Sequence, residues 1–267
     1  MITRLMYNEK EYRIYPTADE RGNLMEEILV AAAFYITCVL TAVFTALQMR
    51  KATRVKRILA SIVLFAAGFI ALNCQRNFIR FNYFILGGLL FSLTGVILLG
   101  TRKSNALRMI GAITFIGVNI LYFFAFKNNI ADEFDAGLYN IVFFAGLVVF
   151  LDFGGLAFLS GEKAFALKNL LLLPNVIAAS ATASLGVSLG IRYLNTDSYS
   201  ITLGVLLVLG CALFAYANLA VSKSFIKNDR YDLNSKKARF EKLAVPAYYI
   251  GQLLLVCAML FVRIGRQ

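Results

Sequence analysis

The sequence predicts an all-α membrane protein with eight transmembrane helices. Hydrophobic residues make up 60% of its 267 residues, and the mean hydropathy of +0.71 lies above that of soluble domains. The apolar runs are too long for core strands, and most reach the ~20 residues that cross a ~30 Å hydrocarbon core. We expect helices at approximately 28–47, 58–73, 81–100, 109–126, 138–158, 170–191, 199–221 and 243–262.

The chain is expected to form one membrane domain after a short arm. Residues 1–26 are too polar and too charged for a signal peptide, so they predict an exposed N-terminal arm. No linker or low-complexity segment divides residues 27–267, which we expect to form a single eight-helix transmembrane domain. The helix at 58–73 is short and would need snorkelling side chains or a thinner bilayer. Segments 88–96 and 210–218 share a pattern of small residues, which fits either a four-plus-four pseudo-repeat or plain helix packing.

The positions of Lys and Arg predict the orientation in the membrane. Most of the 27 basic residues stand at one end of the predicted helices, in loops 49–57, 101–108, 159–169 and 222–242. Such loops favour the cytoplasmic side, so both termini should lie outside, and the lack of a targeting segment is typical of a bacterial inner (plasma) membrane protein. The net charge of +12 is spread over helix ends, which indicates orientation and anionic lipid contact rather than nucleic-acid binding.

Few side chains in the predicted helices can move a proton. The sequence has no histidine, and the eight apolar segments contain one carboxylate, Asp152. Ionisable residues are costly in a bilayer and usually mark a working site there. Two interpretations of Asp152 stay open: it pairs with Lys163 or Lys168 where the helix leaves the membrane, or it is an acid kept neutral by apolar surroundings and used in acid–base catalysis.

No metal site and no cofactor are predicted. The four cysteines sit mostly inside helices without metal-ligand spacing, so they are interpreted as small packing residues.

Side chains from five helices, all of them polar except that of Val96, fall at similar depths in the cytoplasmic half. Counted from the helix ends at 1.5 Å per residue, the depths of Val96, Asp152 and Asn218 agree within ~5 Å. The other polar side chains at this depth, or about one turn further in, are Asn119, Tyr248, Tyr249 and Gln252. Buried amides and phenols need hydrogen-bond partners in lipid, so these side chains either join helices or line a cavity.

Four segments that contain these residues are similar to a known family. They are 88–99 (GLLFSLTGVILL), 110–126 (IGAITFIGVNILYFFAF), 210–221 (GCALFAYANLAV) and 247–255 (AYYIGQLLL). Their order and spacing, together with the eight-helix count, resemble the YhhN-like lysoplasmalogenases. The similarity covers the third to eighth helices, so the chain is identified as a divergent member of this family.

The resemblance implies a multipass enzyme that cleaves the vinyl ether bond of lysoplasmalogens and releases a fatty aldehyde. This reaction protonates an enol ether and adds water, so it needs a proton donor and a base. The family pattern has an acid where Val96 stands, a histidine where Asn119 stands before Tyr122, and Asp or Asn where Asn218 stands. Val96 cannot exchange a proton, and Asn119 can hydrogen-bond but cannot titrate.

These departures leave three functions open. In the first, the protein hydrolyses a lysophospholipid, with Asp152 and Asn218 as catalytic residues. The substrate-binding residues are then Val96, Asn119, Tyr122, Tyr248, Tyr249 and Gln252. In the second, the protein binds or senses a membrane lipid without catalysis, because the acid and the histidine are missing. The third, an ion or solute transporter, would rest on a single intramembrane acid.

Overall fold

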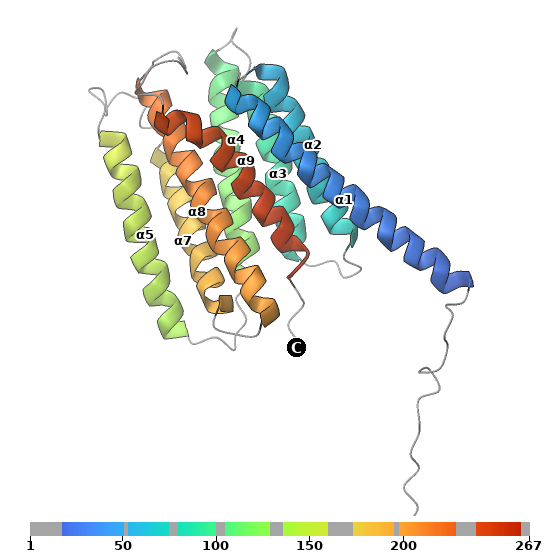
Figure 1. The fold of residues 1–267 in the computed structure, drawn as a ribbon. Helices are drawn as coiled ribbons and strands as arrows, with labels where there is room; N and C mark the ends of the chain where they lie inside the picture. The colour runs from blue at the N-terminus through green and yellow to red at the C-terminus, as the bar shows by residue number, and fades with distance from the viewer. Residues whose placement is uncertain are drawn as a thin grey trace, which may run out of the picture.

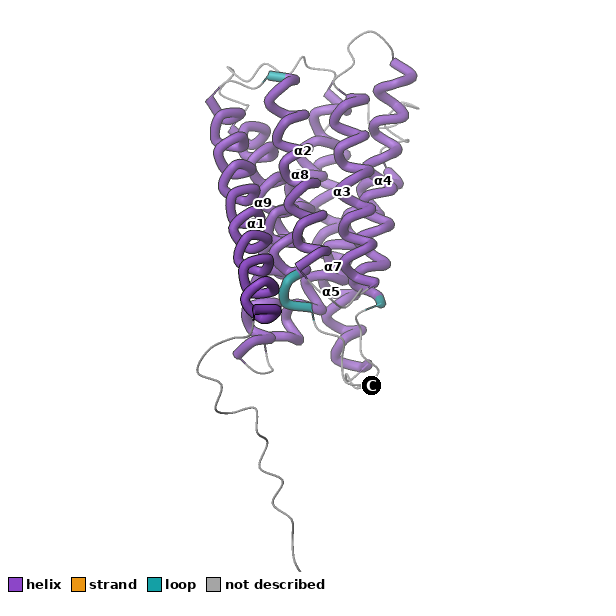
Figure 2. Tube along the Cα trace, turned by 90° about the vertical axis from the view of Figure 1, so that its right-hand side faces the viewer, coloured by secondary structure: helices purple, strands orange, loops and turns teal. Residues whose placement is uncertain are grey.

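The apolar runs fold into long helices, each antiparallel to the one before it, as Figure 1 and Figure 2 show. The computed structural model describes residues 18–50, 53–74, 80–99, 105–128, 136–159, 173–194, 198–227 and 239–262, and every regular element in these ranges is a helix. In chain order the helices are α1 (Ala18–Arg50), α2 (Arg54–Cys74), α3 (Arg80–Leu99), α4 (Asn105–Lys127), α5 (Ala136–Leu159), α7 (Leu173–Leu194), α8 (Ser198–Lys227) and α9 (Arg239–Met259).

Each of the eight predicted segments is helical, which confirms the all-α fold class. Several bounds differ from the expected ones by three or more residues, and those of α1 and α2 bear on the predictions. Helix α1 begins at Ala18, well before residue 28, because the Glu, Leu and Met residues that precede the apolar run are strong helix formers. Helix α2 has 21 residues, so the segment expected to be short is long enough to cross a bilayer. Residues 1–17 of the expected arm lie outside the described part of the chain.

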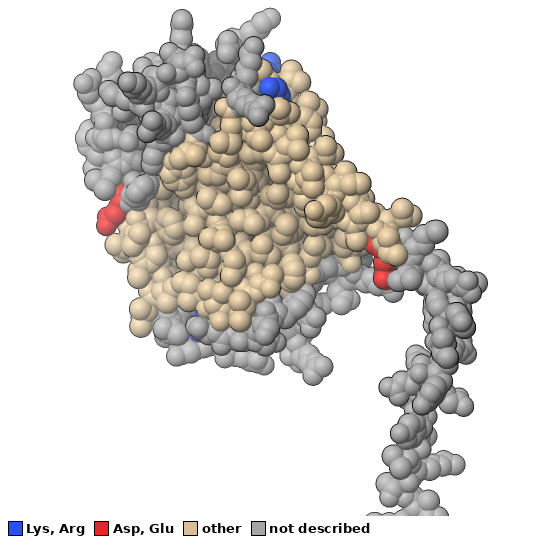
Figure 3. Space-filling model, viewed as in Figure 1, with Lys and Arg blue, Asp and Glu red and all other residues tan. Residues whose placement is uncertain are grey.

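Large apolar side chains cover the outside of the bundle. Tyr35 on α1 is 70% exposed and Ile141 on α5 is 68% exposed, and Figure 3 shows a broad face of uncharged residues with Asp and Glu only at its edges. Such a surface is typical of a protein that faces hydrocarbon rather than water. The chain is therefore an integral membrane protein.

Five of the eight predicted membrane spans are long and apolar enough to cross a membrane within the described residues. These helical segments are Glu27–Met49, Arg54–Cys74, Arg80–Leu98, Pro174–Leu194 and Ile201–Ala220. The other three helices contain shorter apolar stretches, which are Ile113–Lys127, Asn140–Asp152 and Leu243–Met259.

Helix α9 lies between α8 and the first three helices of the chain. It packs extensively against α8 and also contacts α1, α2 and α3, while α3 packs on α4 and α7 packs on α8. Helix α5 lies at the edge, where it packs on α7 and less extensively on α8 (Figure 1). Between their described residues, α5 has no comparable contact with α3 or α4.

Glycine pairs allow α7, α8 and α9 to approach one another at backbone distance. A Cβ atom on Gly190 would lie 2.8 Å from the carbonyl oxygen of Gly204, and a Cβ atom on Gly251 would lie 2.9 Å from the carbonyl oxygen of Gly210. In lipid, close backbone approach supplies the van der Waals contact that holds helices together. The pair Gly210 and Gly251 therefore sets the position of α9 on α8, and α9 carries three of the predicted site residues.

Candidate functional site

A group of neutral polar side chains lies in the interior where α3, α4 and α9 meet. We call it the central cluster, and its members are Ser92, Tyr122, Tyr248 and Gln252. The hydroxyl oxygens of Ser92 and Tyr248 are 2.6 Å apart, and the Ser92 hydroxyl donates to Oε1 of Gln252 over 3.3 Å. All four side chains are buried. Ser92 therefore links α3 to two successive turns of α9.

Aromatic rings hold the two tyrosines of the central cluster in place. The ring of Phe214 on α8 contacts both, with centroid distances of 5.2 Å to Tyr122 and 5.8 Å to Tyr248. The ring of Phe115 on α4 meets Tyr248 edge-on at 5.8 Å. Gly88 on α3 leaves the space that the Tyr122 ring fills, because a Cβ atom there would lie 2.7 Å from Cδ1 of the ring. The phenol groups are thus positioned by packing as well as by hydrogen bonds.

Two polar groups of the central cluster have no hydrogen-bond partner among the described residues. The Tyr122 hydroxyl and Nε2 of Gln252 are both buried and unpaired. Leaving such a group unsatisfied costs about 1–3 kcal/mol, and native structures normally supply a partner, often an ordered water. Both groups can donate a hydrogen bond, so the complementary partner is an acceptor. Water and the ether, ester or phosphate oxygens of a lipid all have this chemistry.

Tyr249 extends the polar network from the central cluster to α2. Its hydroxyl donates to the backbone carbonyl of Arg57 over 3.0 Å and lies 3.1 Å from Oγ of Ser61. Its ring stands edge-on to the ring of Tyr248, with the centroids 5.3 Å apart. Tyr249 is therefore a joint between α2 and α9 as much as a candidate binding residue.

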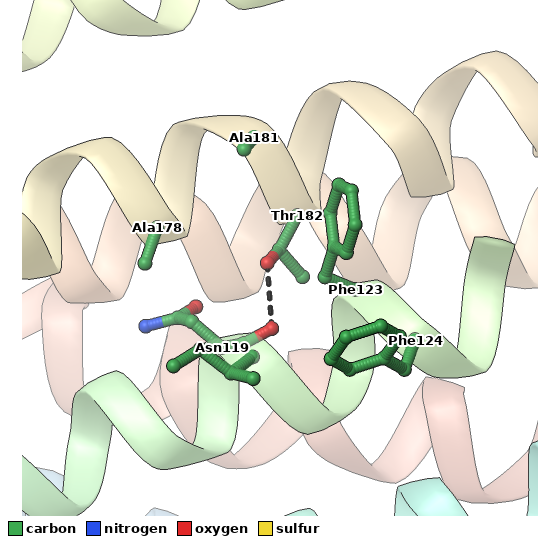
Figure 4. A pocket seen from close by; sticks show the side chains of 7 residues that line it. Asn119, Phe123, Phe124, Ala178, Ala181 and Thr182 are labelled. Carbon is green, nitrogen blue, oxygen red and sulfur yellow. Dashed lines mark hydrogen bonds between the residues drawn. The ribbon is translucent and has the colours of Figure 1, made fainter.

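Asn119 forms a second polar junction, between α4 and α7. Its Nδ2 donates to the carbonyl of Phe115 over 2.9 Å and to Oδ1 of Asn175 over 3.2 Å. The Thr182 hydroxyl on α7 donates to the backbone carbonyl of Asn119 over 2.7 Å, which Figure 4 draws as a dashed line. Asn119 thus has the helix-joining role that was one of its two sequence interpretations.

An apolar groove opens beside this junction, and we call it the α4–α7 groove. Its volume is about 300 Å³, which is at the small end of ligand-binding pockets. Ile120 and Phe124 on its rim are 46% and 41% exposed on the outside of the bundle, so the groove is open to the bilayer. The residues that line it, shown in Figure 4, are Asn119, Ile120, Phe123, Phe124, Ala178, Ala181 and Thr182. Walls of this composition suit an alkyl chain.

Three predicted site residues lie outside both the central cluster and the polar contacts of Tyr249 and Asn119. Asp152 is exposed on α5, a helix without extensive contact to α3 or α4 in the described ranges. Val96 is half-buried on α3. Asn218 on α8 is buried, and its Nδ2 donates to the carbonyl of Phe214 in the same helix over 2.9 Å. Equal depth therefore does not bring Asp152 to the central cluster.

The residues that the structure does bring together are Tyr122, Tyr248, Tyr249 and Gln252, with Asn119 at the neighbouring junction. Sequence reasoning missed their partners Ser61, Ser92, Asn175 and Thr182. Serine and threonine in membrane helices are common packing residues, so their type alone gives no signal. For Ser92 there is a weak sequence signal, because its hydroxyl-bearing side chain stands at the centre of segment 88–96.

Comparison with known proteins identifies the family. No curated protein and no solved structure matches the chain. The model of the YhhN family matches residues 56–259, which extends from the start of α2 to the end of α9 and covers well over half of the sequence. The matched region includes the whole central cluster and the α4–α7 groove. The chain therefore belongs to the YhhN family.

Proposed function

We propose that this member of the YhhN family binds a membrane lipid within its helical bundle and does not hydrolyse it. The observation that carries the proposal is the composition of the central cluster, in which the described side chains are one alcohol, two phenols and one amide. Cleavage of a vinyl ether begins with protonation of carbon, which needs a general acid that titrates near the working pH. Tyrosine, which ordinarily titrates near pH ~10, is too weak an acid for that step.

The rest of the chain supports the same proposal. Val96 stands where the lysoplasmalogenase pattern has an acid, and the sequence contains no histidine. Asp152, the one carboxylate of the predicted membrane segments, is exposed on α5 and does not reach Val96 or the cluster. An acid that replaces the missing one is therefore not found among the described residues at the site.

Lipid binding is supported by two features on which α4 borders, the central cluster and the α4–α7 groove. On one side, the unpaired Tyr122 hydroxyl and Gln252 amide offer hydrogen bonds to an oxygen of a lipid head. On the other, the α4–α7 groove offers an apolar channel for a chain. Asn119 and Tyr122 are three residues apart, so both features lie within about one helical turn.

We further propose that all eight helices span the bilayer, with the basic loops on the cytoplasmic side.

Native mass spectrometry and an aldehyde assay test the proposal together. Purified protein should carry a bound lipid, and protein supplied with lysoplasmalogen should release no more aldehyde than a protein-free sample. Gln252→Leu removes the unpaired donor at similar volume and should lower lipid occupancy. Ile250→Leu, on an exposed position of the same helix, is the matched control. Catalytic release of aldehyde by the wild-type protein would overturn the proposal.

Hydrolysis of lysoplasmalogen is the second candidate, because the lysoplasmalogenase resemblance and the two unpaired donors both fit an ether-bearing substrate. In this version Asp152 supplies the proton, and Asp152→Asn abolishes aldehyde release. Turnover that survives Asp152→Asn would assign the acid to another residue.

A further inference from the structure

Helix α5 presents a continuous exposed face on the side away from α7. We call this face the outer stripe, and its residues are Asn140, Ile141, Phe144, Ala145, Val148, Val149 and Asp152. The opposite face packs closely, since a Cβ atom on Gly146 would be in contact with Cβ of Ser184 on α7 at 3.4 Å. One side of α5 therefore belongs to the bundle, and no other described helix covers the opposite side.

The outer stripe has the spacing of a helix-pairing seam. Ile141, Ala145, Val148 and Asp152 follow one another at intervals of four, three and four residues, which is the repeat of positions that meet in paired helices. Ile141 and Val148 are 68% and 57% exposed, so the described part of the chain leaves more than half of each side chain uncovered. The small side chain of Ala145 between them favours close approach of a second helix.

Asp152 is the residue of this seam that needs a partner, and Lys163 and Lys168, which the sequence offers as partners, lie outside the described residues. Its side chain is exposed next to Val148 and Val149, on a helix that is otherwise apolar around this position. A carboxyl group among hydrocarbon is unfavourable unless it is neutral and hydrogen-bonded. In Figure 3, acidic atoms stand at the left edge of the uncharged face, on the side of the bundle where α5 lies.

We propose that the outer stripe is the contact with a second copy of this chain, in which two Asp152 side chains face each other across a two-fold axis normal to the membrane. Copies of one protein share their orientation in a membrane, so the paired α5 helices are parallel and the two Asp152 residues lie at equal depth. A neutral carboxyl group both donates and accepts a hydrogen bond, so it is complementary to its own copy. Self-complementarity is what a two-fold contact requires.

Other occupants fit the stripe less well. Asp152 lies seven residues before the end of α5 at Leu159, so a lipid amine would have to descend about 10 Å from that helix end. A different membrane protein would need a basic residue of its own at the same depth, and such residues are rare inside membranes. A second copy carries the same Asp152 carboxyl group at the same depth. One polar residue in an apolar seam also sets the register of pairing.

Disulfide crosslinking in native membranes tests the proposal. In a variant whose four native cysteines are replaced by alanine, Val148→Cys should form crosslinked dimers under a mild oxidant. Ile62→Cys, a lipid-facing position on α2 that is 46% exposed, is the matched control and should not. Adding Asp152→Leu should lower the dimer yield of Val148→Cys by about three- to tenfold, the range that one interhelical hydrogen bond supplies. Asp152→Asn, which still donates and accepts, should preserve most of it.

Copurification of two differently tagged full-length copies gives a second measurement that needs no cysteine replacement. The wild-type copies and the Asp152→Asn copies should copurify, and the Asp152→Leu copies should do so several-fold less. A yield for Val148→Cys no greater than for Ile62→Cys would overturn the α5 contact. Copurification unaffected by Asp152→Leu would overturn the role of Asp152.

Discussion

The hydroxyl groups of Ser92 and Tyr248 lie 2.6 Å apart and connect α3 to α9 in the middle of the bundle. Because the Ser92 hydroxyl also donates to Gln252, the Tyr248 hydroxyl must be the donor in the shorter contact. A chain of three polar groups thus runs from a phenol through an alcohol to an amide. It ends on the amide nitrogen of Gln252, which is the group that still lacks an acceptor.

Removing the centre of this chain should destabilise the bundle. Ser92→Ala leaves the Tyr248 hydroxyl and Oε1 of Gln252 buried without their partner, so we expect a loss of about 1–3 kcal/mol in the free energy of unfolding. Tyr248→Phe should cost about 1 kcal/mol, and the double variant should cost less than the sum because the two residues share one contact. Unfolding in detergent micelles measures all three.

Thr94→Ala is the control for this series, because Thr94 is exposed on the same helix and, within the described structure, its hydroxyl donates only to the carbonyl of Leu90. Equal losses for Ser92→Ala and Thr94→Ala would contradict the central role of Ser92.

Two adjacent glycines of α3 should respond in opposite ways to alanine. Gly88→Ala places a methyl group against the buried ring of Tyr122, which Phe214 holds from another side, so overpacking should cost about 1–3 kcal/mol. At Gly87 the nearest atom to the new methyl group is Cδ1 of Leu121 at 3.5 Å, an ordinary contact. Gly87→Ala should therefore be neutral or stabilise the helix by up to about 1 kcal/mol. Melting temperatures that rank the two variants the other way would refute this packing.

Filling the α4–α7 groove should displace a lipid chain without unfolding the protein. Ala181→Phe puts a phenyl ring into the 300 Å³ space, so bound lipid should fall by about tenfold, equivalent to ~1.4 kcal/mol of binding free energy. Ile113→Phe, at a position on α4 that is 59% exposed and does not line the groove, should leave occupancy unchanged. Native mass spectrometry measures the lipid occupancy of both variants. An unchanged lipid signal with Ala181→Phe would show that the lipid chain does not lie in the groove.

A native cysteine can test the predicted orientation. Cys74 is exposed at the end of α2 opposite the basic loop 49–57, so a membrane-impermeant maleimide should label it from outside intact cells. Cys211 is buried in the bundle and should stay unlabelled. A cysteine introduced by Lys103→Cys in the basic loop 101–108 should react only after the membrane is permeabilised. Labelling of that loop in intact cells would contradict the predicted orientation and indicate the opposite one.

The helices could be predicted because each long apolar run has one plausible structure in a bilayer, where the backbone must satisfy its own hydrogen bonds. Their ends were less predictable. The charged residues before Ile28 mark the edge of the apolar run, but they are good helix formers, and α1 continues through them to Ala18. Hydropathy therefore locates the membrane segment better than it locates the helix.

The depth of the predicted site residues in the membrane could be counted from the sequence, but the side of the helix on which each residue lies could not. Counting residues places Asp152 at the level of Val96 and Asn218, yet the face on which it lies depends on how α5 packs against α7. Helix α5 is apolar all round, so its sequence carries no amphipathic signal that distinguishes the bundle side from the lipid side. The contact of Ser92 with Tyr248 spans 156 positions in the chain, and no local pattern indicates such a pairing.

The neutrality of the central cluster also decides which forces can act on it. The membrane potential works on charge, at about 2.3 kcal/mol per elementary charge for each 100 mV. An alcohol, two phenols and an amide carry no net charge at physiological pH, and none of these groups ordinarily changes its charge between pH 5 and pH 8. Rearrangements of Ser92, Tyr122, Tyr248 and Gln252 would therefore move no charge across the membrane, and neither the membrane potential nor a proton gradient would drive them.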